Sequence, residues 1–335
     1  MTIKDLAALT GYSVGTVSRV LNNQPNVSEK AKKAILEAAE VSGFQLNANA
    51  KQLKQSHSNS VLVVVRGTSN EMFSGLVETI QACVANTSYQ LIVDYIDENS
   101  NEVTRAQQLC REKKPLGILF LGGNREHFLD GFSSIGVPCV LATNDATGLG
   151  FSNLSSVTTD DILAARTAID HLVQLGHRKI VVIGGDRNDS GIAKLRYQGC
   201  MEAFVRHGIE FDPEQDYESV RFSFEQGYQA AKNLVNKGRK FTALFAISDV
   251  MAIGAVRALR DVGLRVPEDV SVMGFDGLEM GRYTVPTLST IRQNVDAMAR
   301  RSVELLLENI QAMQLPRYET IPFDLELGES TKENR

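Results

Sequence analysis

The side chains best suited to chemistry near the start of the chain lie between residues 13 and 22. Six of them are expected to point outward from a helix, and all are small or hydrogen-bonding: Val14, Gly15, Thr16, Ser18, Arg19 and Asn22. Small side chains let a helix enter the major groove of DNA, and an arginine can bind guanine or phosphate through two hydrogen bonds. This pattern favours a DNA-reading helix over the alternative, a solvated three-helix bundle whose outer face would usually carry Glu and Lys.

Two short helices joined by a tight turn are predicted to position this face. The first starts at a capping-box-like Thr2 and Asp5 and ends at Gly11, which can adopt the left-handed conformation. Its apolar stripe is Ile3, Leu6 and Leu9. Ser13 caps the second helix, which is predicted to run from Val14 to about Asn22. Its inward residues are Val17, Val20 and Leu21.

A third helix is predicted between Ser28, its N-cap, and Gly43, its stop. It would pack through Ala31, Ile35, Ala38 and Ala39. Three short helices, of which the first two are joined by a glycine-containing turn, are typical of a helix-turn-helix.

The distribution of charge agrees with a DNA-binding head. The net charge of the chain is −5, yet residues 1–60 carry seven basic and four acidic residues, so this segment is positive and the rest is negative. A basic head on an acidic body confines nucleic-acid contact to the head.

Other classes of protein are disfavoured by what the sequence lacks. The four cysteines are far apart without a C-x-x-C pair, so we expect reduced thiols in a cytoplasmic protein, with no metal and no cofactor: Cys83, Cys110, Cys139 and Cys200. The charged N-terminus does not resemble an export signal, and no apolar run reaches the length of a membrane span. No dinucleotide, phosphate-loop or nucleophile-elbow motif supports an enzyme.

From residue 61 onward, apolar strands alternate with amphipathic helices. Strands are predicted at Val61–Val65, Leu91–Tyr95, Gly117–Leu121, Cys139–Ala142, Lys179–Ile183, Ala243–Ala246 and Ser271–Gly274. Helices between them include Ser74–Ala85, Ala164–Leu175, Tyr228–Lys237 and Val250–Val262. This alternation predicts an α/β fold of two doubly wound parallel sheets, with ligands beyond the carboxyl ends of the strands.

Nearly the whole chain resembles the lactose/galactose repressor (LacI/GalR-type) family. The most specific motifs in the head are Ile3–Ala7, Gly11–Asn22 and Val27-Ser28. Those in the body are Leu175–Ile180, Ser248–Gly254, Gly274–Asp276 and Val285–Ile291. The resemblance implies a helix-turn-helix head, a two-lobed periplasmic-binding-protein-like body and a ligand-responsive regulator, most often a repressor.

The resemblance also implies a set of DNA contacts. Base reading is expected from Val14, Gly15, Thr16 and Arg19. Phosphate contacts are expected from Ser13, Ser18, Asn22 and Ser28. Gly15 departs from the family, which often places a base-reading side chain at this position, so recognition at that base pair is left open.

Residues 47–60 are expected to form a hinge helix and linker between the head, 1–46, and the body, 61–335. About eight residues form a marginal helix in isolation, and Leu53 has no core to enter. The resemblance implies that Asn47, Ala50 and Leu53 contact DNA, with the leucine wedged into the minor groove of the operator. The alternative from the residues alone is an ordinary interdomain linker.

The resemblance divides the body into two lobes, roughly 61–158 with 290–314 and 159–289 with 315–335. It places five residues in a ligand cleft: Phe73, Arg196, Phe222, Ser248 and Asp276. Arginine donates through a planar fork and aspartate accepts from two hydroxyls, which suits a sugar diol or a polar heterocycle. Ser248 stands where many sugar-binding relatives have Asn, and Phe222 could instead belong to the core. Asp249 is expected to cap a helix.

The expected partners are operator DNA, a sugar-like effector and a second copy of the chain in a homodimer on a pseudo-palindromic site. A purine or nucleoside effector is the alternative, as is a catabolite regulator assisted by a phosphoprotein. A solute-binding protein of a transporter would share the lobes but not the DNA-binding head.

Overall fold

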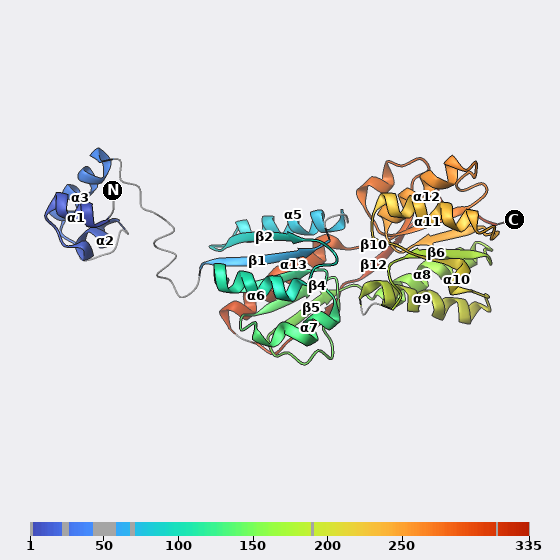
Figure 1. The fold of residues 1–335 in the computed structure, drawn as a ribbon, viewed down its shortest axis with the longest axis horizontal. Coiled ribbons are helices and arrows are strands. Elements are labelled where there is room, and N and C mark those ends of the chain that lie inside the picture. The colour runs from blue at the N-terminus through green and yellow to red at the C-terminus, as the bar shows by residue number, and fades with distance from the viewer. Residues whose placement is uncertain are drawn as a thin grey trace. The chain divides into compact units, whose positions relative to one another are not determined.

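The computed structural model of the protein describes residues 3–21, 27–42, 58–67, 71–188, 191–312 and 314–334. The chain forms two compact units, Met1–His57 and Ser58–Arg335 (Figure 1). Within the described residues, no helix is both long and apolar enough to cross a membrane.

The described part of the first unit consists of α1 (Ile3–Thr10), α2 (Val14–Leu21) and α3 (Glu29–Val41). Gly11, at a φ of +72°, ends α1, and the Ser28 hydroxyl accepts a hydrogen bond from the backbone N–H of Ala31 at 3.3 Å. These are the turn and the cap that the sequence predicts.

The three helices enclose a small core of Leu6, Ala7, Val17, Val20, Ala31, Ile35 and Ala39. The predicted stripe on α1 is wrong at Leu9, which is 62% exposed. A spacing of three residues drifts away from a helix face that repeats every 3.6 residues, and Ala7 completes the buried face beside Leu6 instead.

The second unit contains two six-stranded sheets, one in each of two lobes. The first sheet has the order β11-β5-β4-β3-β1-β2 and is parallel throughout. Its strands are β1 (Ser60–Arg66), β2 (Gln90–Ile96), β3 (Gly117–Leu121), β4 (Cys139–Ala142), β5 (Leu154–Thr158) and β11 (Tyr318–Thr320). Buried residues of α5 (Met72–Ala85) and α13 (Val295–Gln311) form one core of this lobe. Those of α6 (Glu102–Lys113), α7 (Arg125–Gly131) and η1 (Phe132–Ser134) form the other.

The second sheet has the order β12-β10-β9-β8-β6-β7, and only β12 runs antiparallel, to β10. Its strands are β6 (Ile180–Gly184), β7 (Tyr217–Ser219), β8 (Ala243–Ala246), β9 (Ser271–Asp276), β10 (Ser289–Gln293) and β12 (Phe323–Glu326). The helices of this lobe are α8 (Asp161–Gln174), α9 (Ile192–His207), α10 (Pro213–Asp216), α11 (Phe224–Asn236), α12 (Asp249–Asp261) and η2 (Glu279–Arg282).

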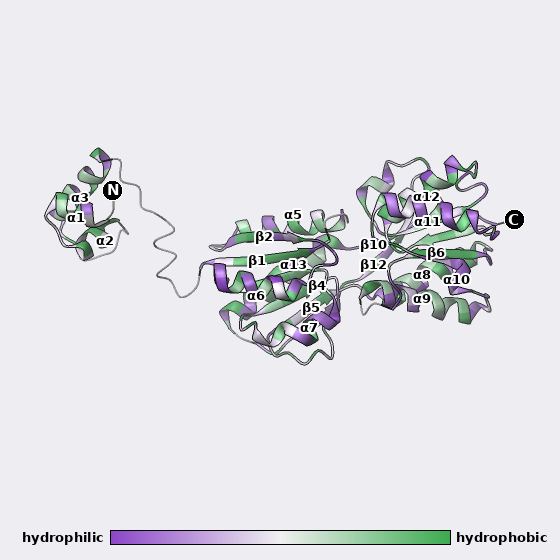
Figure 2. Cartoon of the chain, viewed as in Figure 1, coloured by the Kyte–Doolittle hydropathy of each residue, from purple (hydrophilic) through white to green (hydrophobic). Residues whose placement is uncertain are grey.

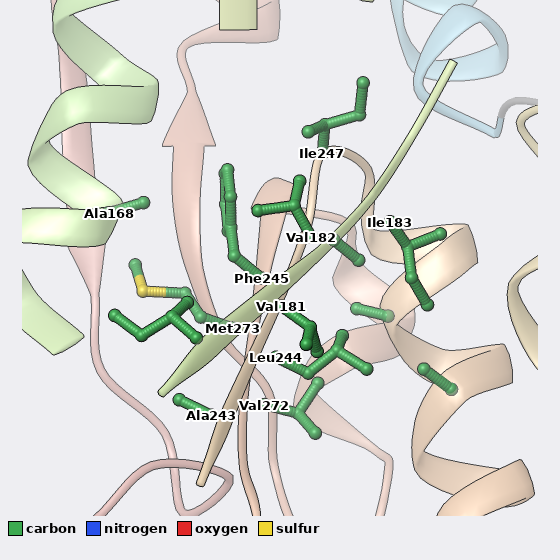
Figure 3. Close-up of a cluster of buried hydrophobic side chains, with 14 of the residues drawn as sticks. Ala168, Val181, Val182, Ile183, Ala243, Leu244, Phe245, Ile247, Val272 and Met273 are labelled. Atoms are coloured by element: carbon green, nitrogen blue, oxygen red, sulfur yellow. The ribbon is translucent and has the colours of Figure 1, made fainter. Parts of the chain in front are cut away.

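Strands β3, β6 and β8 are apolar and buried, as is β1 between Ser60 and Arg66, which fits sheets covered on both faces (Figure 2). In the second lobe, Val181, Phe245 and Met273 come from three neighbouring strands and lie in one fully buried cluster (Figure 3).

The chain passes between the lobes three times, and the expected lobe boundaries need adjustment. β10 belongs to the second sheet, so the crossover lies after Gln293 rather than near 289, and α13 then packs in the first lobe. β11 pairs with β5 in the first sheet, so the return to the second lobe follows Thr320 rather than 315. β11 in the first sheet and β12, which pairs with β10 in the second, are short edge strands, and both lack a continuous apolar run.

Candidate nucleic-acid interface and ligand cavity

The outward face of α2 is arranged as the sequence predicts. Val17 and Val20 are buried against the other two helices, while Val14, Gly15 and Arg19 are exposed. Thr16 and Ser18 are half-buried beside them. The described head therefore presents one arginine and several small side chains on a single helix face, which is the geometry that a major groove accepts.

Ser13 and Ser28, two predicted phosphate contacts, lie at helix N-termini. The Ser13 hydroxyl accepts from the backbone N–H of Thr16 at 3.1 Å and lies 2.9 Å from the Thr16 hydroxyl. Helix N-termini favour phosphate groups because their first amide groups point outward. Asn22, Asn47, Ala50 and Leu53 lie outside the described residues.

The fold does not require glycine at position 15. A Cβ atom there would meet only the Ser13 hydroxyl, at an ordinary 3.7 Å. The absence of a side chain therefore leaves the outer face of α2 open, and no neighbouring atom within the described head explains it.

Between the two lobes of the second unit lies a cavity of about 460 Å³. Phe73 at the start of α5 lines it from the first lobe, and Phe222 before α11 lines it from the second. The Phe222 ring also packs against the core of its lobe, as the core alternative predicts, and its contact with a ligand stays a prediction. A cavity of this size, partly apolar with a few polar groups, is typical of a small-molecule site.

The first-lobe wall of the cavity rests on a fully buried carboxylate, that of Glu102. It accepts a hydrogen bond from the backbone N–H of Asn124 at 2.6 Å, lies 2.8 Å from Nδ1 of His127 and pairs with Arg66 at 3.4 Å. The neighbouring Thr143 has a φ of +78°, and its hydroxyl accepts from the N–H of Gly122. Hydrogen bonds within the protein therefore hold this wall in place without a ligand.

Arg196, Ser248 and Asp276 form a fully buried network beside the cavity but do not line it. Arg196 donates to Asp161 at 2.8 Å, approaches Asp276 at 3.4 Å and stacks on the Phe275 ring at 3.6 Å. Ser248 donates to the second oxygen of Asp276 at 2.7 Å. These three predicted ligand residues are thus brought together, and their contact with a ligand stays a prediction.

The guanidinium group of Arg196 lies beside two buried carboxylates, those of Asp161 and Asp276. Burial raises the pKa of Asp276, and burial raises the pKa of Asp161 to about 6, while Arg196 opposes both shifts. Burial and the nearby Asp276 also raise the pKa of Asp249 well above its ordinary value. Low-dielectric surroundings disfavour the charged form of each carboxyl group.

Asp249 is structural, although it is not the expected helix cap. Ser248 holds the N-cap position of α12, and Asp249 is its first residue. Its carboxylate accepts from the Thr290 hydroxyl and from the backbone N–H of Leu278, both at 2.7 Å. It therefore fastens β10 and the turn after β9 to the start of α12.

Sequence reasoning missed the groups that connect the lobes. Gln293, at the end of β10, donates to Asp276 at 2.9 Å and accepts from Thr159 at 2.8 Å, beside another crossover. Arg221 of the second lobe pairs with Asp97 and Glu98 of the first. The sequence signal that could have identified these residues is their position at or just after the end of a strand. No His, Cys, Asp and Glu cluster fit for a metal ion occurs in the described parts of the chain.

Comparisons with known proteins match both units. The family model described as "Bacterial regulatory proteins, lacI family" matches residues 2–47, and that of a "Periplasmic binding protein-like domain" matches 169–331. The HTH-type transcriptional regulator MalR of Clostridium butyricum is 34% identical, over 92% of this chain and 93% of its own length. The ribose operon repressor of Haemophilus influenzae is 30% identical, over 92% of each. The structure of the transcriptional regulator CelR–cellobiose complex is 28% identical, with a TM-score of 0.74 over 98% of this chain and 99% of the other.

Proposed function

Because the chain belongs to the lacI family of bacterial regulatory proteins, we propose that it is a repressor whose affinity for a pseudo-palindromic operator is controlled by a small effector. The observation that carries this proposal is the presence in one chain of an exposed reading face on α2 and a cavity between two lobes. Neither an enzyme nor a transporter's solute-binding protein needs the first of these features. The proposal includes no catalytic activity and places the protein in the cytoplasm, where the chromosome is.

The proposed DNA contacts come from the head and from the hinge segment 47–60. Val14, Gly15, Thr16 and Arg19 would read bases, and Ser13, Ser18, Asn22 and Ser28 would contact phosphates. Asn47, Ala50 and Leu53 are proposed to contact the minor groove. Phosphate contacts position the helix and base contacts supply the specificity, so Arg19 is the residue whose loss should matter most for sequence preference.

The proposed effector is a sugar or a sugar derivative. Phe73 and Phe222 offer one apolar surface from each lobe, and the amide and hydroxyl groups of Asn99, Thr143 and Asn144 also line the cavity. Two similar proteins carry sugars in their names, the ribose operon repressor and the CelR–cellobiose complex. A purine or nucleoside effector is the alternative, and a phosphoprotein coregulator is a further possibility that no contact of the described residues favours. Arg196, Ser248 and Asp276 would join the ligand if the lobes rearranged around it.

A homodimer is proposed because one small head buries too little surface for useful affinity, and two heads in register double the contact. The second lobe offers a surface for self-association. Tyr283 and Val285 are 77% and 85% exposed, and Met280 and Leu327 are exposed too. Exposed apolar groups gathered in this way commonly mark a protein–protein contact.

The test is a fluorescence-anisotropy titration of the full-length protein on the DNA upstream of its own gene. Nanomolar binding that weakens with salt, and that changes on adding a saccharide, is the expected result. Arg19→Ala should lose the preference for this DNA over a scrambled duplex, while Arg257→Ala, an exposed arginine of α12, should keep it. Equal affinity of the wild-type protein for both duplexes would refute the proposal.

A further inference from the structure

The charges around the cavity between the lobes are already matched within the protein. Among the described residues, two guanidinium groups line it, those of Arg66 and Arg221, and no lysine does. Each is paired with carboxylates of the chain, and the carboxylate of Asp186 lines the opposite wall. The hydrogen bonds and apolar contacts available to a ligand therefore come mainly from the uncharged lining residues.

Arg66 is held on the first-lobe wall. Its Nε donates to the carbonyl of Ser100 at 3.2 Å and lies 3.4 Å from the buried Glu102 carboxylate. Because Glu102 is fully buried and cannot be reached by solvent, its negative charge compensates Arg66 whether or not a ligand is present.

Arg221 is neutralised from the other side of the cavity. It follows β7 in the second lobe, yet it donates through Nη2 to Asp97 at 2.9 Å and through Nε to Glu98, both just after β2 in the first lobe. Among the described residues, these are the ion pairs that join the two lobes. The backbone N–H of Asn99 and, after it, the pairing with Arg221 lower the pKa of Asp97. These pairs therefore occupy the guanidinium group of Arg221, which lines the cavity.

An anionic ligand would meet as many carboxylates as guanidinium groups on the described lining. Glu98 and Asp186 line the cavity together with Arg66 and Arg221, and both arginines are already paired. No ion pair within the described chain reaches Asp186, whose Oδ1 accepts the N–H of Asn188. The start of α9 at Ile192 also lines the cavity, and its amide groups can donate to a hydroxyl oxygen as well as to an anion.

The uncharged lining is suited to a hydroxyl-rich molecule. Asn99, Thr143, Asn144, Ser219 and Gln226 line the cavity, and each side chain can both donate and accept a hydrogen bond. Phe73 and Phe222 supply apolar surface from opposite lobes. A ring that carries hydroxyl groups on its edge and C–H groups on its faces matches both kinds of lining.

We propose that the cavity selects an uncharged, hydroxyl-rich ligand over its phosphorylated counterpart, and that Arg221 is the specificity-determining residue because Asp97 and Glu98 of the other lobe pair with it. This inference rests on the proposed function, since it concerns the effector of the same cavity. Its test separates the two.

The test compares the full-length wild-type protein with the double variant Asp97→Asn/Glu98→Gln, which frees Arg221. Calorimetry with matched pairs, namely cellobiose, ribose and adenosine and the phosphate of each, should show the wild-type protein binding a neutral member at least about tenfold more tightly than its phosphate. The double variant should lose this preference. Asp324→Asn/Glu326→Gln, which frees Arg282 and Arg292 on the outer surface, is the matched control and should keep it. A phosphorylated member that binds the wild-type protein more tightly than its neutral partner overturns the inference.

Two further measurements keep the inference testable without a known ligand. Inorganic phosphate, compared with chloride at equal ionic strength, should raise the melting temperature of the Asp97→Asn/Glu98→Gln variant more than that of the wild-type protein or the control. An equal rise in all three contradicts the inference. Arg221→Gln should weaken every neutral ligand that binds, whereas loss of phosphorylated ligands alone would show that Arg221 contacts the ligand's phosphate. Failure of salt-sensitive operator binding would refute the proposed function and leave these contrasts intact.

Discussion

At the scale of single residues, Arg196 holds the second lobe together besides its proposed role toward the ligand. It is 2% exposed and is paired with the buried Asp161 and Asp276. Removing one member of a buried ion pair leaves an uncompensated charge and typically costs about 3–5 kcal/mol. We therefore expect Arg196→Met to lower the free energy of unfolding of the ligand-sensing unit by that amount and to abolish the effector response, while operator recognition by the separate head remains.

Urea unfolding of the full-length protein measures this effect. Arg187→Met is the control, since the partner of that arginine in the same lobe is the largely exposed Glu214, and exposed pairs are worth about 0–1 kcal/mol. If Arg196→Met and Arg187→Met were equally stable, the buried network would not carry the stability assigned to it.

Asp161 gives a prediction about pH. Burial raises its pKa to about 6 in the folded protein, against about 3.9 in an unfolded chain. Because the folded state binds this proton more tightly, the contribution of Asp161 to stability is fully present below about pH 4 and is lost as the pH rises to 6. Asp161→Asn should therefore remove part of the fall in unfolding free energy between pH 4 and pH 7. Parallel curves for the two proteins across this range would contradict the assigned pKa.

The residues of the candidate site could be predicted to different degrees. Phe73 follows a buried strand closely and does line the cavity, because the end of a parallel strand determines where its loop must lie. Arg196 lies within α9, and its partners Asp161 and Asp276 are 35 and 80 residues away in sequence. Such a network depends on how three elements pack, which no local pattern contains.

At the scale of elements, the segment 47–54 is the part of the proposed DNA-binding machinery whose folding we expect to depend most on its binding partners. About two helical turns cannot offset the cost of helix nucleation in water, so we propose that this segment gains its helical packing from DNA and from its copy in the dimer. Leu53→Ala should then keep the dimer, the fold and ligand binding, yet lose much of the preference for operator over random DNA.

Competition binding at several salt concentrations tests this prediction. Nonspecific, salt-dependent affinity should survive in Leu53→Ala because it rests on phosphate contacts. Leu129→Ala, an exposed leucine of α7, controls for loss of apolar surface. An unchanged ratio of operator to random affinity in Leu53→Ala would exclude the wedge.

Strands that are continuous apolar runs could be predicted from the sequence, and short or polar strands could not. The predicted strands at 117–121, 139–142 and 243–246 match β3, β4 and β8 residue for residue, since buried parallel strands are continuous apolar runs. β7, β11 and β12 have three or four residues each, mostly only partly buried, and their strand conformation depends on the neighbour with which they pair. The two displaced lobe crossovers adjoin β10 and β11, which the sequence did not predict as strands.

At the scale of the whole molecule, the two lobes are joined by three crossovers and by the Arg221 ion pairs at the cavity. Gln293 and Thr159 connect two of these crossovers to the buried network around Asp276. An effector that prefers one arrangement of the lobes would shift the population toward it, and the spacing of the first lobes in a dimer would change accordingly. We propose this as the route from the cavity to the hinge segments.

The most direct test of this account is selection from a random duplex library by the full-length protein, followed by sequencing of the bound DNA. A dimer that reads bases through α2 predicts enrichment of one pseudo-palindromic site with two half-sites about one helical turn, or a multiple of it, apart. Enrichment should change when an effector that binds the cavity is added, as expected for a ligand-responsive repressor. Recovery of no preferred sequence, or of a single half-site without its inverted copy, would contradict the account.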